Sequence, residues 1–260
     1  MADPNVSQTP RHVAVIGAGG GIGRACVAAF AASGWRVLAA DRDGDAMRLA
    51  LDELDRSDPH EAHGVDVRDR HAIDRFARHI GSVDAMIYCA GLVATMPIAE
   101  TDFDVFDHVM AVNLSGAAHA ASAFARTMKS ARTGGSMVFI ASTAGLRGEA
   151  NASAYCASKF GLIGLVQSVA AELTACDIRV NAVAPGNVDT PMLRRVAEDI
   201  AALEDRSVEA VWHDLAHAGA AQRLIKPEEV ASLCVALCAP QSAGLTGATI
   251  PIDGGALLLA

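Results

Sequence analysis

Apolar runs and amphipathic stretches alternate along the whole chain of 260 residues. Short apolar runs predict buried strands at 12–17, 35–41, 62–67, 83–89, 136–142, 178–184 and 249–252. Stretches of helical character lie between them, at 21–33, 43–56, 69–80, 102–129, 154–175 and 227–238. Strands that alternate with helices form βαβ units with right-handed crossovers. We therefore predict an α/β fold, with one doubly wound parallel sheet of about seven strands and helices on both faces. No linker interrupts the pattern, so a single domain over 1–260 is expected.

One segment departs from this alternation. Residues 189–225 come between a strand and a helix but are too many for a simple connection. The segment contains Met192, Trp212, His213 and His217. A structural insertion is one interpretation. We favour a substrate lid that lies over the carboxyl ends of the strands.

The first predicted strand runs directly into a glycine-rich loop, Gly17-Ala18-Gly19-Gly20-Gly21-Ile22-Gly23, and a helix follows at once. Tight turns also use glycine, so the cluster alone is weak evidence. Between a strand and a helix, however, glycines let the backbone approach a pyrophosphate, and the N–H groups of the helix then face it. No Lys-Ser or Lys-Thr pair follows, which excludes a P-loop. The loop predicts a dinucleotide site in a Rossmann-type domain.

Asp41 ends the second predicted strand, 18 residues after Gly23. A carboxylate at this place can accept hydrogen bonds from the adenosine ribose and would repel a 2′-phosphate. Arg42 is the counter-argument, because a guanidinium can pair with that phosphate. We expect NAD rather than NADP. Without the glycine loop, Asp41 would be interpreted as an ordinary solvated acid at a strand end.

Composition and charge narrow the function classes. Hydrophobic residues make up 52% of the chain and aromatic residues 4%, which is typical of helices packed tightly on a sheet. The net charge is −9 and no basic stripe is visible, which argues against nucleic-acid binding. We identify no run that reaches the roughly 20 apolar residues of a membrane span, and the first residues lack the apolar core of a secretory signal. We expect a cytoplasmic protein with no membrane partner.

The six cysteines show neither a CxxC pair nor a histidine-flanked metal spacing. Cys234 and Cys238 are four residues apart on a predicted helix and share a face there. Two ligands without nearby partners make a poor zinc site. Reduced thiols in a reducing compartment are the simpler interpretation, and no metal site is predicted.

Tyr155 and Lys159 are four residues apart in a predicted helix, so they lie on one helix face. A phenol with a pKa near 10 is a poor base at neutral pH, and a neighbouring ammonium group would lower that pKa. Such a phenol can take a proton from an alcohol or return one to a carbonyl oxygen. Ser142 ends the preceding strand and can hydrogen-bond the same oxygen. A YxxxK pair is common by chance, but together with Ser142 and a dinucleotide loop it predicts carbonyl–alcohol chemistry.

At this point the sequence resembles the short-chain dehydrogenase/reductase family in its compact form of about 250 residues. The resemblance extends from about Val13 to Gly255. It rests on the GxxxGxG loop (Gly17, Gly21, Gly23), the Asp66-Val67 pair, the VNL segment with Asn113, Ser142, the YCASK segment of Tyr155 to Lys159, RVNAVAPGNVDTPM (Arg179–Met192) and the terminal IDGG (Ile252–Gly255).

The resemblance implies a role for each matching position. Tyr155 would be the acid/base, and Ser142 would orient the substrate oxygen. Lys159 would bind the nicotinamide ribose and lower the pKa of Tyr155, while Asn113 would hold a water that connects Lys159 to solvent. Asp66 and Val67 would flank the adenine. The whole expected cofactor site comprises Gly17, Gly20, Gly21, Ile22, Gly23, Asp41, Arg42, Asp66, Val67, Ala90, Gly91, Tyr155, Lys159, Pro185, Gly186, Val188 and Thr190.

Two positions depart from the family pattern. Ile16 stands where the family usually has a threonine before the first glycine, and Cys89 replaces the second asparagine of the family's NNAG segment. In the family these polar residues help to tie strands together around the cofactor loop. Their joint loss indicates that a polar link has been exchanged for apolar packing. This puts the local hydrogen bonding and cofactor affinity in question, not the reaction.

The sequence does not identify the substrate, which is expected to be a small alcohol or ketone, such as a small hydroxy acid or a cyclic alcohol or diol. Most residues expected around it are apolar, with a few polar anchors. The substrate set comprises Ser142, Leu146, Glu149, Tyr155, Asn187, Met192, Trp212 and His213, with Leu92, Val93, Thr95 and Ala144 as further candidates. His213 and His217 can equally be surface or packing residues.

Two other function classes compete with an NAD-dependent dehydrogenase or reductase. An epimerase or dehydratase of nucleotide-sugars also carries YxxxK and a glycine loop, but it needs a larger C-terminal region than the roughly 20 residues after Pro240. A non-catalytic NAD-binding regulator would have no need of Asn113, Ser142, Tyr155 and Lys159 together. By resemblance we expect a homotetramer, with the apolar tail Ala256–Ala260 against a neighbouring subunit.

Overall fold

In the computed structural model, seven strands form one parallel sheet in the order β3-β2-β1-β4-β5-β6-β7. The structure describes residues 11–43, 47, 51 and 60–259. The strands are β1 (His12–Ile16), β2 (Arg36–Asp41), β3 (Glu61–Gly64), β4 (Ala85–Tyr88), β5 (Gly135–Ile140), β6 (Ile178–Pro185) and β7 (Thr249–Ile252). The predicted α/β fold class and the predicted strands are confirmed.

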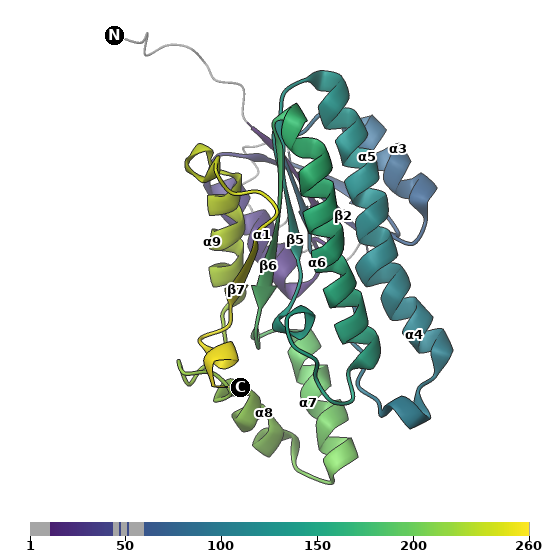
Figure 1. Ribbon diagram of the computed structural model, residues 1–260, viewed down its shortest axis with the longest axis vertical. Coiled ribbons are helices and arrows are strands. Elements are labelled where there is room, and N and C mark those ends of the chain that lie inside the picture. The colour runs from purple at the N-terminus through teal and green to yellow at the C-terminus, as the bar shows by residue number, and fades with distance from the viewer. Residues whose placement is uncertain (1–10, 44–46, 48–50, 52–59, 260) are drawn as a thin grey trace.

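Helices cover both faces of this sheet, as Figure 1 shows, with α1 and α9 on one face and α3, α5 and α6 on the other. Most of the predicted helix 43–56 lies outside the described residues. Within this range, Met47 and Leu51 are described and are helical. The described helices are α1 (Gly21–Ala32), α3 (Arg70–Ile80), α4 (Phe103–Met110), α5 (Gly116–Ala131), α6 (Ser153–Leu173), α7 (Pro191–Glu204), α8 (Val208–Ala216) and α9 (Pro227–Cys238).

The apolar strand runs are explained by burial on both sides of the sheet. In β1, Val13 and Val15 face the helices α1 and α9, whereas Ala14 and Ile16 face α3, α5 and α6. Side chains of a strand alternate between its faces, so a strand covered on both sides must be apolar at every position. This is why continuous apolar runs, rather than alternating ones, marked the strands in the sequence.

The strand order reverses between β1 and β4. From β1 the chain adds β2 and β3 towards one edge of the sheet, and from β4 it adds β5, β6 and β7 towards the other edge. In open α/β sheets, ligands bind in the crevice outside the carboxyl ends of the strands at such a reversal. The glycine loop follows β1 at this point, and residues 89–91 follow β4. Figure 1 shows α7 and α8 beyond the same end of the sheet.

The predicted helix 102–129 is found without a break from residue 103, but it is not α-helical throughout. It consists of α4, a π-helical turn (Ala111–Ser115) and α5. The phenol of Tyr88 donates a hydrogen bond of 2.6 Å to the carbonyl oxygen of Val112 in this turn. A π turn holds one residue more than an α turn and often marks a functional site. Here the turn places Asn113 in a fully buried position.

One helical stretch is more apolar than we expected of any part of this chain. Residues Ser153–Cys176, which include α6, form one helical stretch long and apolar enough by length and composition to cross a membrane, with a mean hydropathy of 1.2. Our expectation that no run reaches this limit was therefore wrong. The stretch packs Leu162, Val166 and Ala170 into the core against the sheet, which gives its apolar character a role inside the fold.

Gly116 offers a test of the packing behind the π turn. A Cβ at this position would lie 2.5 Å from the Tyr88 hydroxyl and 3.0 Å from the Val67 side chain. We predict that Gly116→Ala destabilises the fold by roughly 1–3 kcal/mol through overpacking. Tyr88→Phe should cost about 1 kcal/mol, because the Val112 carbonyl loses its partner. The double variant should be less destabilised than the sum, because Tyr88→Phe also removes the clashing oxygen.

Melting temperatures measured by calorimetry would check this coupling, with about 2–4 °C expected per kcal/mol for a chain of this size. Gly164→Ala is the matched control, because a Cβ there would meet nothing within 4 Å. Its effect should simply add to that of Tyr88→Phe. Strict additivity of Gly116→Ala and Tyr88→Phe would contradict the predicted contact.

Candidate functional site

A cavity of about 180 Å³ opens at the carboxyl ends of β4, β5 and β6. Its wall brings together residues from both halves of the sheet and from α6 and α7. They are Ile22, Cys89, Gly91, Val93, Thr95, Ile140, Ala141, Ser142, Thr143, Glu149, Ala150, Ala152, Tyr155, Lys159, Pro185, Gly186, Asn187, Val188, Thr190, Met192, Leu193, Val196 and Ile200. The expected residues Ser142, Tyr155 and Lys159 therefore share one wall.

Tyr155 stands in the first turn of α6, and Ser142, which interacts with it, lies two residues after the end of β5. Loss of solvation raises the pKa of Tyr155 to about 12, and a hydrogen bond with Ser142 partly opposes this rise. The Ser142 hydroxyl also accepts the backbone N–H of Ala144 at 3.1 Å, which fixes its orientation. Ser142 therefore lies where it can share a hydrogen-bonded oxygen with Tyr155.

Lys159 is buried one turn further along α6, and its Nζ donates a hydrogen bond of 2.8 Å to the carbonyl oxygen of Ile140. Burial lowers the pKa of Lys159 to about 8, and the nearby Cys89 thiol acts weakly in the opposite direction. The Nζ atom lies over the Tyr155 ring, 5.6 Å from its centroid.

Burial is the main influence on the pKa of Tyr155 in this geometry. We expected Lys159 to lower the pKa of Tyr155, whereas in this arrangement the pKa of Tyr155 is raised. The cause is that desolvation outweighs every other influence on the phenol, and the ammonium is held at the Ile140 carbonyl rather than at the phenol oxygen. A lowering of this pKa by Lys159 stays an expectation from the YxxxK spacing.

Asn113 connects the π turn to the rest of the site. Its amide oxygen accepts the backbone N–H of Leu92 at 2.7 Å, and its Nδ2 donates to the Leu92 carbonyl at 2.8 Å and to Ser158 Oγ at 2.9 Å. Ser158 in turn donates to the carbonyl oxygen of Tyr155 at 2.7 Å. Asn113 thus holds the loop after β4 against the first turns of α6. Sequence reasoning missed Ser158, although it lies within the YCASK segment.

The glycine loop is packed too tightly for any other residue at two positions. Gly17 has a φ of +83°, and a Cβ there would lie 2.4 Å from the backbone nitrogen of Ala90. A Cβ on Gly23 would lie 2.0 Å from the Gly17 carbonyl oxygen. The loop is therefore held against β4 and against its own helix, which brings residues 89–91 beside it.

The first turn of α1 carries no capping side chain and no acidic residue. Its N–H groups and the positive end of the helix dipole are thus available to an anion such as a pyrophosphate. A Cβ on Gly21 would meet Thr190 at 2.7 Å, so the loop also adjoins the segment after β6. An uncapped helix end beside the cavity is what a dinucleotide needs, and these residues fit a nicotinamide cofactor.

Asp41 has a contact that sequence reasoning missed. Its carboxylate accepts the backbone N–H of Gly19 at 2.9 Å and that of Asp43 at 3.0 Å. The side chain therefore ties the glycine loop to the end of β2. A carboxylate offers about four acceptor positions, so two remain for ribose hydroxyls.

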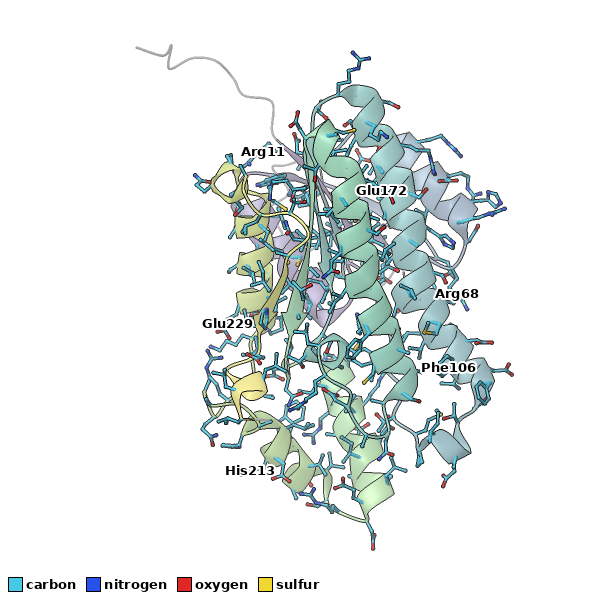
Figure 2. All side chains as sticks on the ribbon, in the orientation of Figure 1. Arg11, Arg68, Phe106, Glu172, His213 and Glu229 are labelled. Carbon is cyan, nitrogen blue, oxygen red and sulfur yellow. The ribbon has the colours of Figure 1, made fainter. Side chains whose placement is uncertain are left out.

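Asp66, which was expected to flank the adenine, is paired with a neighbouring side chain. Both oxygens of Asp66 accept hydrogen bonds from Arg68, the shortest being 2.6 Å from Nη2. This pairing lowers the pKa of Asp66, and the exposed Arg42 contributes a smaller part of the shift. Val67 is buried behind it. Figure 2 shows Arg68 on the outer side of the molecule.

The segment 189–225 supplies part of the cavity wall through α7. Met192, Leu193, Val196 and Ile200 line the cavity at intervals of three to four residues, which is one face of the helix. Asn187 anchors the segment by donating 2.8 Å to the carbonyl oxygen of Leu215 in α8. Sequence reasoning named only Met192 here, although the apolar spacing was available in the sequence.

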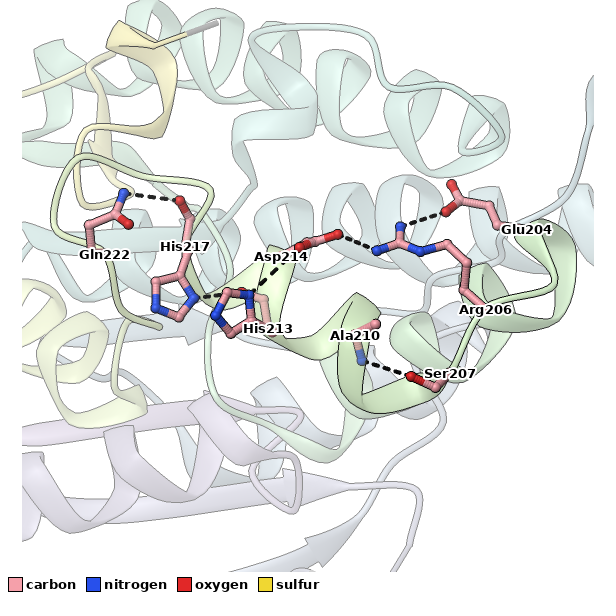
Figure 3. Close-up of polar contacts among 8 residues, drawn as sticks. All are labelled: Glu204, Arg206, Ser207, Ala210, His213, Asp214, His217 and Gln222. Carbon is pink, nitrogen blue, oxygen red and sulfur yellow. Dashed lines mark hydrogen bonds and ion pairs between the residues drawn. The ribbon is translucent and has the colours of Figure 1, made fainter.

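Five residues expected around the substrate do not line the cavity: Leu146, Trp212 and His213 of the substrate set, and Leu92 and Ala144 of the further candidates. We correct these expectations. Leu146 is exposed outside it. Trp212 packs with the α7–α8 apolar cluster, under the Arg194 guanidinium at 5.2 Å from the ring centroid. His213 stacks on His217 with ring centroids 4.1 Å apart on the outer side of α8 (Figures 2 and 3). The reason is that α8 turns its apolar face towards α7 rather than towards the cavity.

Both departures from the family pattern lie in apolar packing. Ile16 is buried in the core on the α6 side of the sheet. The Cys89 thiol lies 3.9 Å from the Cys26 thiol of α1, and Cys26 also interacts with Cys234 of α9. Cys89, which replaces the usual asparagine, thus belongs to a group of three neighbouring cysteine side chains.

Comparisons with known proteins extend over most of the chain. A sequence model described as short chain dehydrogenase matches residues 11–201. Dehydrogenase/reductase SDR family member 6 from Danio rerio is 36% identical over 236 residues, which cover 90% of this chain and 92% of that protein. Galactitol 2-dehydrogenase (L-tagatose-forming) from Cereibacter sphaeroides is 35% identical over 247 residues, 93% of each chain.

Two further comparisons concern length and structure. An uncharacterized short-chain type dehydrogenase/reductase from Sinorhizobium fredii is 34% identical over 97% of this chain, which spans only 45% of that protein. The crystal structure of a variant actinorhodin polyketide ketoreductase with NADPH has a TM-score of 0.91 at 29% identity and covers 95% of this chain and 97% of its own. With the site geometry, these likenesses show that the chain belongs to the short-chain dehydrogenase/reductase family, oxidoreductases that use a nicotinamide cofactor.

Proposed function

We propose that this chain interconverts a secondary alcohol and a ketone with NAD, with Tyr155 as acid/base. One observation carries the proposal: the wall that holds Ser142, Tyr155 and Lys159 also contains Ile22 of the uncapped helix and the residues after β6. A cofactor on the loop would thus share a cavity with the proton-transfer groups. The relative named galactitol 2-dehydrogenase supports a secondary alcohol.

In this proposal the protein residues bind the substrate oxygen and move its proton. Ser142 donates a hydrogen bond to the substrate oxygen, while Tyr155 takes the proton of the alcohol or returns it to the ketone oxygen. Lys159 favours the phenolate form by its positive charge, and Asn113 fixes the backbone on which both side chains stand. When bound, NAD supplies the hydride chemistry at its nicotinamide ring.

We propose NAD over NADP because of Asp41, whose carboxylate retains free acceptor positions towards a ribose. Among the residues proposed for the cofactor, Pro185, Gly186, Val188 and Thr190 line the cavity, and Gly17, Gly20, Gly21 and Gly23 belong to the glycine loop. The neighbouring Arg42 makes the preference worth measuring, because it offers a cation to a 2′-phosphate.

Three further expectations remain proposals. We propose that the single domain 1–260 uses the segment 189–225 as a substrate lid, since α7 already lines the cavity. We propose a homotetramer, because Phe160 and Leu258 remain 47% and 84% exposed. We propose a cytoplasmic location, because all six cysteines are free thiols.

The first test of the reaction is Tyr155→Phe. We expect a loss of about 10²- to 10⁴-fold in kcat with NAD and a panel of secondary alcohols, because the acid/base is gone. The formation of NADH is followed by absorbance. NADH binding, measured by fluorescence, should be retained and serves as the control for folding. Equal turnover by Tyr155→Phe and the parent enzyme would refute the assigned role.

The buried lysine predicts a titration that is independent of activity. The chain has three lysines, so 13C labelling at Cε gives few signals, and Lys159→Met identifies the one of interest. Lys159 should titrate near pH 8 rather than at its usual 10.5. Because its folded-state pKa is lowered, the folded chain binds fewer protons than the unfolded chain between these values, and stability should rise with pH there. The melting temperature of Lys159→Met should lack this part of the slope. A Lys159 signal that titrates near 10.5 would contradict the prediction.

Asp41→Asn tests the cofactor preference. The amide oxygen can keep one of the two backbone N–H bonds, while the negative charge is removed. We expect the ratio of kcat/KM for NAD to that for NADP to fall by about tenfold, which corresponds to one lost charge repulsion. Melting temperatures report whether the loop remains folded. An unchanged ratio in a folded variant would exclude Asp41 as the determinant.

A further inference from the structure

The cavity wall has an unusual distribution of charge. Of the described residues that line it, Glu149 and Lys159 alone have side chains of the Asp, Glu, Lys or Arg type, and the lining contains no histidine. The Lys159 ammonium is held at the Ile140 carbonyl and faces Tyr155. No cation of the described wall is therefore left to pair with a carboxylate or phosphate on the substrate.

The loop that carries Glu149 is fixed on both sides of the cavity. The backbone N–H of Glu149 donates a hydrogen bond of 3.3 Å to the sulfur of Cys156. Cys156 directly follows Tyr155 in the sequence. Two residues after Glu149, the carbonyl oxygen of Asn151 accepts a hydrogen bond of 2.7 Å from the backbone N–H of Met96. This bond joins the loop to the segment after β4, whose neighbouring residue Thr95 lines the cavity. Asn151 itself has a φ of +59°, typical of a tight turn. The backbone therefore holds Glu149 at a set place beside Tyr155.

The Glu149 side chain lines the same cavity as Tyr155 and Ser142. Its negative charge contributes to the raised pKa of Tyr155. Partial loss of solvation raises its own pKa, and the flanking Arg147, which does not line the cavity, acts in the opposite direction. Within the described part of the chain, no side chain forms a hydrogen bond or salt bridge with this carboxylate. Its acceptor positions remain available to a ligand.

We propose that Glu149 determines the charge of the substrate: it accepts hydrogen bonds from additional hydroxyl groups of an uncharged substrate and rejects anionic ones. This inference rests on the proposed function, whose substrate class it narrows from alcohols in general to neutral, hydroxyl-rich alcohols and ketones. Hydrogen bonds from a hydroxyl to a carboxylate are charge-assisted and strong. A carboxylate on the substrate would meet a like charge on the wall of the cavity, and the two would repel each other. Small hydroxy acids, one of the classes expected from the sequence, are therefore poor substrates.

A matched pair of compounds tests this inference. 3-Hydroxybutyrate and its methyl ester have the same carbinol centre and differ in charge, while galactitol provides a neutral compound with additional hydroxyls. For each we would measure kcat/KM with NAD in the parent enzyme and in Glu149→Gln, which keeps the shape of the side chain. Binding to the enzyme–NADH complex, measured by calorimetry, supplies a readout that does not require turnover.

We expect the parent enzyme to prefer the ester over the acid. Glu149→Gln should raise kcat/KM for the acid about tenfold, leave the ester within about twofold, and weaken galactitol about tenfold. Glu198→Gln, which removes an equal charge from the exposed side of α7, is the control and should leave the three compounds in their original order.

Two results would overturn the inference: a parent enzyme that prefers the acid, or an acid-to-ester ratio that Glu149→Gln leaves unchanged in both kinetics and binding. The proposed function fails in a different way. A charge preference in calorimetry that depends on Glu149, without turnover of any compound, would support the assignment of Glu149 and count against the reaction.

Discussion

The site depends on one unfavourable condition, the burial of the Lys159 ammonium group. A cation that is removed from water loses solvation, and this loss lowers the pKa of Lys159 to about 8. The fold tolerates the burial because the Ile140 carbonyl at the end of β5 accepts a hydrogen bond from Nζ. That carbonyl is available only because the strand stops there. The carboxyl end of the sheet thus supplies the partner that keeps a positive charge next to Tyr155.

Much of this arrangement could be predicted from the sequence, for identifiable physical reasons. Strands that are buried on both faces consist of continuous runs of apolar residues. For this reason β1, β5 and β6 could be predicted from the sequence. Tyr155 and Lys159 are connected by helical periodicity, and the glycine loop by its place between a strand and a helix. In each case the information lies within a few consecutive residues.

What could not be predicted depends on contacts between distant segments. The Asp41 carboxylate reaches Gly19, and the Ile140 carbonyl reaches Lys159, but neither distance in space is encoded by local spacing. Trp212 and His213 were chosen as pocket residues by type, whereas the orientation of α8 relative to α7 decides what reaches the cavity. The chemical nature of a side chain indicates what it can do. Only the packing of its helix determines where it does so.

The π-helical turn between α4 and α5 affects how one continuous helix packs against two neighbouring helices, α6 and α3. One additional residue advances the side chains that follow by about 100° around the helix axis. The part before the turn packs mainly against α6, and the part after it packs mainly against α3. The inserted residue therefore acts as a change of phase. It lets a single amphipathic sequence turn its apolar side towards two partners in succession, with Asn113 buried at the point where the direction changes.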